Sequence, residues 1–108
     1  MSRRSLYAAQ PTASVAAVYT STNTHTTITA ATAFNGSGGA ETLDIHVVAS
    51  GDTAGDHNKV YEGLSVADGA TVGLQFLVGH TLGPGDTIQA ASSTTTTIAL
   101  RISGDVHG

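Results

Sequence analysis

The chain has 108 residues, of which 40% are hydrophobic, 11% are charged and none is cysteine. This length suits one domain, and the lack of cysteine excludes disulfides and thiolate metal sites. A surface with so few charges must consist of Thr, Ser, Asn, Gly and Ala. Such a surface repels its neighbours only weakly, which favours a protein whose function is to associate.

The net charge of −4 is unevenly distributed along the sequence. Arg3 and Arg4 lie in the first ten residues with no acidic residue beside them. The rest of the chain contains only two basic residues, Lys59 and Arg101, and eight acidic residues. Double-stranded nucleic acid is not an expected partner, because affinity for phosphate grows with the number of Lys and Arg residues. The Arg pair either anchors a tail on an acidic partner or belongs to a solvated terminus.

Membrane insertion is not expected from this sequence. Its longest apolar runs are far shorter than the roughly 18 residues that a membrane-spanning helix needs. The N-terminal segment is interrupted by Gln10, Pro11, Thr12 and Ser14, so we do not expect it to act as a signal peptide.

Alternation of apolar and polar residues predicts strands along most of the chain. Weaker patterns indicate strands at residues 13–20, 25–33 and 59–66. The strand predicted at residues 42–48 directs Leu43, Ile45 and Val47 toward the core, and Thr42, Asp44 and His46 toward solvent. Further inward side chains are predicted in segments 71–78, 86–91 and 97–103: Val72, Leu74, Phe76, Val78, Ile88, Ala90, Ile98, Leu100 and Ile102.

Turn residues separate these segments at 35–39, 50–58, 67–69 and 82–86, where Gly, Pro, Asn and Asp cluster. A further turn is expected in the run of four threonines at residues 94–97. About seven or eight short strands separated by turns predict an all-β fold, an antiparallel β-sandwich of the jelly-roll or Ig-like kind. Residues 13–108 are expected to form this single domain, preceded by an N-terminal arm or edge segment at residues 1–12.

The C-terminal segments carry a family resemblance. The order TVGLQFLV, LGPGDTIQA, a polar turn SSTTTT and then IALRISG resembles small β-sandwich virion proteins of tailed bacteriophages. Earlier segments match the same pattern: LYAAQPTASVAAVY, the central LDIHVVA, a glycine-rich loop and VYEGLSV. The resemblance covers nearly the whole chain.

The resemblance implies a structural role at the surface of a virion made in the host cytoplasm. The expected function is that of a capsid decoration or cement protein, a symmetric homo-oligomer (trimer or dimer) that binds the major capsid protein or other virion proteins. The alternatives are a tail, collar or fibre-base component, or a carbohydrate-binding attachment module. No nucleic acid, membrane or cofactor is expected as a partner.

Candidate metal ligands occur together only in the loop at residues 50–58, which holds Asp52, Asp56, His57 and Asn58. Their spacing does not match a calcium-binding EF-hand. The other histidines do not have the i, i+4 spacing of a helical zinc site: His25, His46, His80 and His107. We therefore predict that these polar residues cap turns and hold no metal.

Evidence in the sequence for a catalytic site is similarly weak. Gly36-Ser37-Gly38 lacks the flanking residues of a nucleophile elbow, and nothing in the sequence brings Asp44 and Glu62 together as a glycosidase pair. We expect no enzymatic activity and no catalytic residue.

The predicted contact residues are Arg3, Arg4, Leu6 and Tyr7. We expect residues 3–7 either to form an arm that docks on a neighbouring subunit or to lie as an edge strand against their own sheet. Phe34 and Phe76 are expected in the core.

Overall fold

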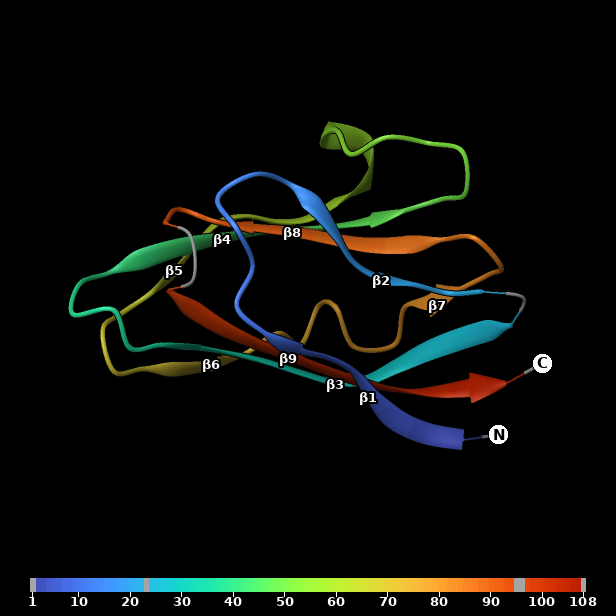
Figure 1. The fold of residues 1–108 in the computed structure, drawn as a ribbon, viewed down its shortest axis with the longest axis horizontal. Helices are drawn as coiled ribbons and strands as arrows, with labels where there is room; N and C mark the ends of the chain where they lie inside the picture. The colour runs from blue at the N-terminus through green and yellow to red at the C-terminus, as the bar shows by residue number, and fades with distance from the viewer. Residues whose placement is uncertain (1, 23, 95–96, 108) are drawn as a thin grey trace.

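The computed structural model describes residues 2–22, 24–94 and 97–107 and contains nine strands and one 3-10 turn in these ranges. The strands form two antiparallel sheets packed against each other (Figure 1). The predicted all-β sandwich is therefore confirmed, with nine strands where seven or eight were expected. Thr95 and Thr96 of the predicted threonine turn lie outside the described residues.

We name the two layers sheet A and sheet B. Sheet A has the strand order β1-β9-β3-β6, with β7 also paired to β3. Its strands are β1 (Ser2–Ala9), β3 (His25–Asn35), β6 (Thr71–Gly73), β7 (Thr81–Leu82) and β9 (Ile98–His107). Sheet B has the order β2-β8-β4-β5. Its strands are β2 (Ala16–Thr20), β4 (Glu41–Val48), β5 (Lys59–Val66) and β8 (Thr87–Ser92).

The core lies between the sheets and is filled by the alternate apolar residues that the sequence predicts. Ile98, Leu100 and Ile102 of β9 are fully buried and face Leu43 and Ile45 of β4 across the sandwich. Burial of each such side chain contributes about 1.5–3 kcal/mol to the hydrophobic driving force. The core is therefore set by period-two patterning in both layers.

The prediction for residues 71–78 is wrong in its second half. Strand β6 ends at Gly73, and the Leu77 N–H then donates to the Leu74 carbonyl to form a turn. This turn buries both Leu74 and Leu77, while Phe76 is 68% exposed and Val78 is 40% exposed. Phe76 is therefore a surface residue, because the strand periodicity stops three residues before it.

Phe34 is also outside the core, contrary to prediction. It lies on the outward side of β3, between the buried residues Ala33 and Asn35, and is 43% exposed. The alternation of the strand places the small Ala33 inward and the aromatic ring of Phe34 in solvent.

His46 was predicted to face solvent, yet it is only 4% exposed. Its outward direction is right, because Val47 on the opposite side of β4 packs against the core. Residues 49–58, which we call the covering loop, include the turn Asp56–Asn58 and pass over sheet B (Figure 1). The loop covers this outer face, and Val48 is buried there as well as His46.

The edges of both sheets are short or irregular. Strands β6 and β7 have three and two residues, and the pairings of β1, β2 and β5 each contain a register shift. Bulges and short edge strands hinder pairing with strands of other molecules. The outer faces of the sheets are therefore better suited to contact a partner than the edges are.

Within the described ranges, no helix is long and apolar enough to cross a membrane.

The burial difference between Leu77 and Phe76 yields a direct test of the corrected core. Leu77→Ala should lower the free energy of unfolding by about 2–5 kcal/mol, because it leaves a cavity in the core. Phe76→Ala removes a larger but exposed side chain and should cost under about 1 kcal/mol. Urea unfolding of both variants measures the difference, and a greater loss for Phe76→Ala would contradict this core.

Candidate contact surface

The outer face of sheet A is built mainly of small side chains from its strands. Cross-strand register defines this face, since residues opposite one another on neighbouring strands point to the same side. Its central members are Ser5, Ala8, Ala30, Thr32, Phe34, Ala99, Arg101 and Ser103. No part of the described chain is folded over this face as the covering loop is over sheet B (Figure 1).

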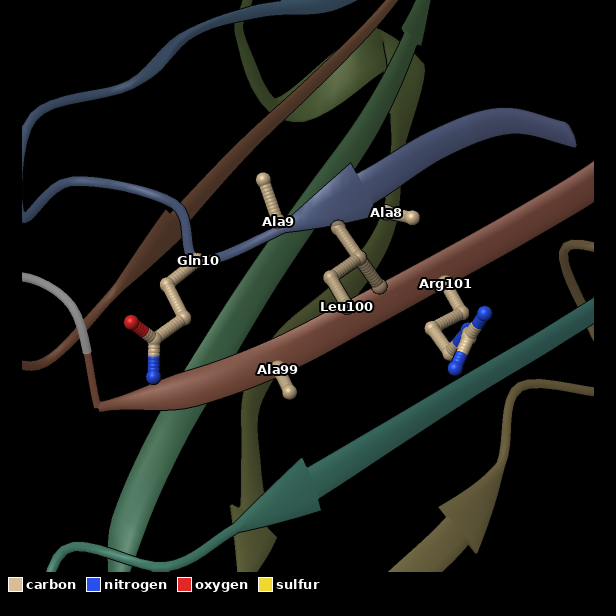
Figure 2. Close-up of a pocket in the computed structure, with 6 residues that line it drawn as sticks. All are labelled: Ala8, Ala9, Gln10, Ala99, Leu100 and Arg101. Atoms are coloured by element: carbon tan, nitrogen blue, oxygen red, sulfur yellow. The ribbon is translucent and has the colours of Figure 1, made fainter.

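Arg101 lies on the central strand of this face, toward the end where β1 and β3 end. It is opposite Ala8 on β1 and Thr32 on β3, and it is exposed. Figure 2 shows Arg101 and Ala99 on one side of β9 and Leu100 on the other. Among the described residues no carboxylate forms an ion pair with its guanidinium, so the charge is available to a partner.

Two adjoining hollows open beside Arg101, where β1 ends at Ala9 and the chain leaves sheet A. The first has a volume of about 250 Å³ and lies between the end of β1 and β9 (Figure 2). The second has a volume of about 330 Å³ and shares Gln10 and Ala99 with the first. Its other lining residues are Phe34, Gly36, Ser37 and Thr97.

The ring of Phe34 is held in place by the residue that follows β3. A Cβ built on Gly36 would lie 3.0 Å from the Phe34 ring, so the glycine allows the ring to lie against the backbone. The ring lies next to the second hollow and is 43% exposed.

The predicted contact residues belong to edge strand β1, so the structure has the second of the two arrangements expected for residues 3–7. Leu6 and Tyr7 pack partly buried against the core, and burial raises the pKa of the Tyr7 hydroxyl above its ordinary value. The Arg3 Nε atom lies 3.3 Å from Asp105 Oδ1 in an ion pair, and Arg4 is exposed. Leu6 and Tyr7 therefore contribute to the fold, and both arginines remain at the surface.

On the opposite side of the molecule, Asn58 holds the covering loop closed. Its Oδ1 atom accepts hydrogen bonds from the Gly55 N–H and from His46 Nδ1, both at 3.0 Å, and its amide donates to the Thr53 carbonyl at 2.9 Å. Because these contacts fix the orientation of the amide, His46 carries its proton on Nδ1. The sequence predicts that polar residues of this loop cap turns, and these hydrogen bonds of Asn58 are such caps.

The polar residues of the loop pair with one another. His57 Nε2 donates to Asp52 Oδ2 at 2.6 Å, and this hydrogen bond holds the pKa of the Asp52 carboxyl below its ordinary value. Lys59 bridges Asp56 and Glu62, and these two acids raise the pKa of the Lys59 ammonium. Across the described residues, no group of three His, Asp or Glu side chains is placed to hold a metal ion.

Of the side chains considered for catalysis, Asp44 and Glu62 lie on the neighbouring strands β4 and β5, and Ser37 lies in the turn after β3. Asp44 Oδ1 accepts the Gly63 N–H at 2.6 Å, while Glu62 pairs with Lys59. The Ser37 hydroxyl donates to the Gly39 carbonyl at 2.9 Å and belongs to the turn after β3. These contacts account for each of the three groups as a structural element of a turn or a strand end.

The charged residues are distributed unequally between the two sheets. The strands of sheet A carry Arg3, Arg4 and Arg101 against Asp105, which is a net charge of +2. Sheet B with the covering loop carries one cation, Lys59, and five acidic residues, which is a net charge of −4. The five acidic residues are Glu41, Asp44, Asp52, Asp56 and Glu62. Arg4 lies off the outer face of sheet A because it is opposite the inward Gly104, so this face has a net charge of +1 and the opposite side of the molecule is acidic.

Sequence reasoning missed the central residues of this face. Arg101 and Ala99 were recognised only as outward positions of a strand, and Phe34 was assigned to the core. Their outward positions were available from period-two alternation, but their proximity to Gln10 depends on the strand order β1-β9-β3, which the sequence does not reveal.

Compared with protein-family models, with curated protein sequences and with solved structures, the chain has no significant match in any of the three.

The hydrogen bonds of Asn58 predict that Asn58→Ala loosens the covering loop. The change leaves His46 and the Gly55 N–H without their acceptor and should cost about 1–3 kcal/mol. Amide exchange of residues 50–58 should accelerate in Asn58→Ala and stay unchanged in the control Thr42→Ala, an exposed substitution on the same face of β4. Equal exchange in both variants would contradict the role of Asn58.

The Asp52–His57 contact predicts a titration that responds to one substitution. The contact favours the deprotonated carboxylate of the folded state. It therefore stabilises the folded state fully above the ordinary Asp pKa, and this stabilisation is lost as pH falls through the lowered pKa. His57→Ala should raise the Asp52 pKa toward its ordinary value, as measured by carboxyl NMR. The Glu41 pKa, which a hydrogen bond from Ser93 lowers, should stay unchanged as an internal control. An Asp52 pKa that does not move would show that His57 is not the cause.

Proposed function

We propose that the chain is a non-enzymatic structural protein of a tailed bacteriophage particle, which decorates the head shell as a symmetric oligomer. The resemblance of its sequence to small β-sandwich virion proteins supports this role. The low share of charged residues, 11%, is also what a surface intended for close packing against other proteins requires.

The observation that carries the proposal is the outer face of sheet A. It is uncovered, it consists largely of Ala, Ser and Thr, and it has an exposed guanidinium on its central strand and an exposed aromatic ring near the end of β3. Aromatic and Arg side chains surrounded by small neighbours are the residues that dominate binding energy in protein interfaces. This face therefore has the composition of a contact surface.

The proposed mechanism is passive adhesion between protein surfaces at the outside of the particle. The partners are the major capsid protein or other virion proteins, together with neighbouring copies of this chain. Because the sheet edges are bulged or short, the faces make the contacts and main-chain pairing at the edges is secondary. Many weak contacts repeated over a shell then add up through avidity.

A second candidate function is carbohydrate binding by an attachment module. The observation that favours it is the hollow beside Phe34, which also has the amide of Gln10 and the hydroxyls of Ser37 and Thr97. Aromatic faces combined with amide and hydroxyl groups suit the apolar and polar sides of a sugar ring. A tail, collar or fibre-base location is a further alternative within the structural class.

Binding to bare phage heads tests the proposal. The purified chain should cosediment with undecorated heads, and Phe34→Ser should weaken this binding roughly tenfold or more, because it weakens the contacts between copies from which the avidity arises. Phe76→Ser is the matched control, because it removes another exposed phenylalanine from a different part of the surface, and it should bind normally.

Two results would decide against head decoration. Failure of the wild-type chain to bind heads would contradict the proposal directly. Binding to a glycan array that Phe34→Ser abolishes, without any binding to heads, would favour the carbohydrate-binding module instead.

A further inference from the structure

We infer that the outer face of sheet A binds the acidic side of a second copy of this chain, so that copies associate through opposite sides of the sandwich. The inference rests on the proposed structural role and deepens it by naming the partner. The partner surface is sheet B together with the covering loop.

Charge complementarity is the first argument. The outer face of sheet A carries Arg3 and Arg101 against Asp105, a net charge of +1, while sheet B and the covering loop have a net charge of −4. Each copy therefore presents both halves of a complementary pair. Contact between the two sides of neighbouring copies brings opposite charges together, which guides association and sets the orientation.

Arg101 is the residue on which this contact depends. It is exposed on the central strand of the outer face, and none of the ion pairs within the described chain includes it. On the acidic side, Asp56 and Glu62 share the single cation Lys59, and their side chains are fully exposed and 72% exposed. Arg101 can form a two-pronged ion pair with such a carboxylate, the geometry that guanidinium groups favour.

The same charges disfavour the symmetric alternative in which two sheet A faces meet. A twofold axis through this face would bring Arg101 near Arg101 of the second copy, and both copies would contribute a basic surface. Contact between unlike sides avoids this repulsion. Such a contact is heterologous, so the copies either close into a ring or form an open stack.

Analytical ultracentrifugation of the full chain tests the inference. The average mass should rise with protein concentration at low salt. It should fall as ionic strength increases from about 0.01 to about 1 M, because the Debye length shortens from about 30 to about 3 Å. Arg101→Glu should weaken self-association roughly tenfold or more.

Matched variants separate the specific contact from a general effect of charge. Arg4→Glu makes the same change of charge in sheet A, but Arg4 is opposite Gly104, whose position faces inward, and so lies off the outer face. This control should associate normally. The double variant Asp56→Lys/Glu62→Lys should associate weakly alone, and its mixture with Arg101→Glu should associate more strongly than either variant does alone.

Three results would overturn the inference. They are a wild-type chain that stays monomeric at all concentrations and salt levels, a closed dimer unaffected by Arg101→Glu, and equal effects of Arg101→Glu and Arg4→Glu. A monomer that still binds bare heads would overturn this inference alone, whereas a monomer that binds no heads would also contradict the proposed function.

Discussion

The structure depends on the alternation of side chains along β9. This strand is central in sheet A, and its inward residues Ile98, Leu100 and Ile102 are fully buried in the core. Its outward residues Ala99, Arg101 and Ser103 lie on the uncovered face. A shift of one residue would exchange the two sets, exposing three large apolar side chains and burying a guanidinium. The same register therefore maintains both the core and the contact surface.

Local patterning was enough to predict most of the core but not where each pattern ends. The segment TVGLQFLV alternates to its end, so it predicts Phe76 inward, whereas a turn after Gly73 places Leu77 inward instead. The turn depends on contacts with β3, such as the hydrogen bond from Leu74 N–H to the Ala31 carbonyl at 2.9 Å. For His46 the direction was right, but its burial depends on a loop anchored by Asn58. Long-range contacts of this kind are not visible in a single sequence.

The contact surface was less predictable than the core for the same reason. The sequence shows an excess of basic residues near the N-terminus but not that Arg3, Arg4 and Arg101 meet in one sheet. That meeting results from the pairing of β1 with β9, which joins the two ends of the chain. Residue types alone therefore predict an associating protein, whereas the strand order shows which outward residues share a face with Arg101. The bulged sheet edges and the neutral-to-basic outer face of sheet A together favour association through the sheet faces. This is consistent with a structural role.

The central claim is that the outer face of sheet A becomes buried when the protein assembles. Hydroxyl-radical footprinting can test this with the two exposed phenylalanines, because Phe34 lies on that face and Phe76 does not. Comparison of the free chain with its assembled form should show that oxidation of Phe34 decreases while oxidation of Phe76 stays unchanged. Protection of Phe76 with continued oxidation of Phe34 would contradict the account.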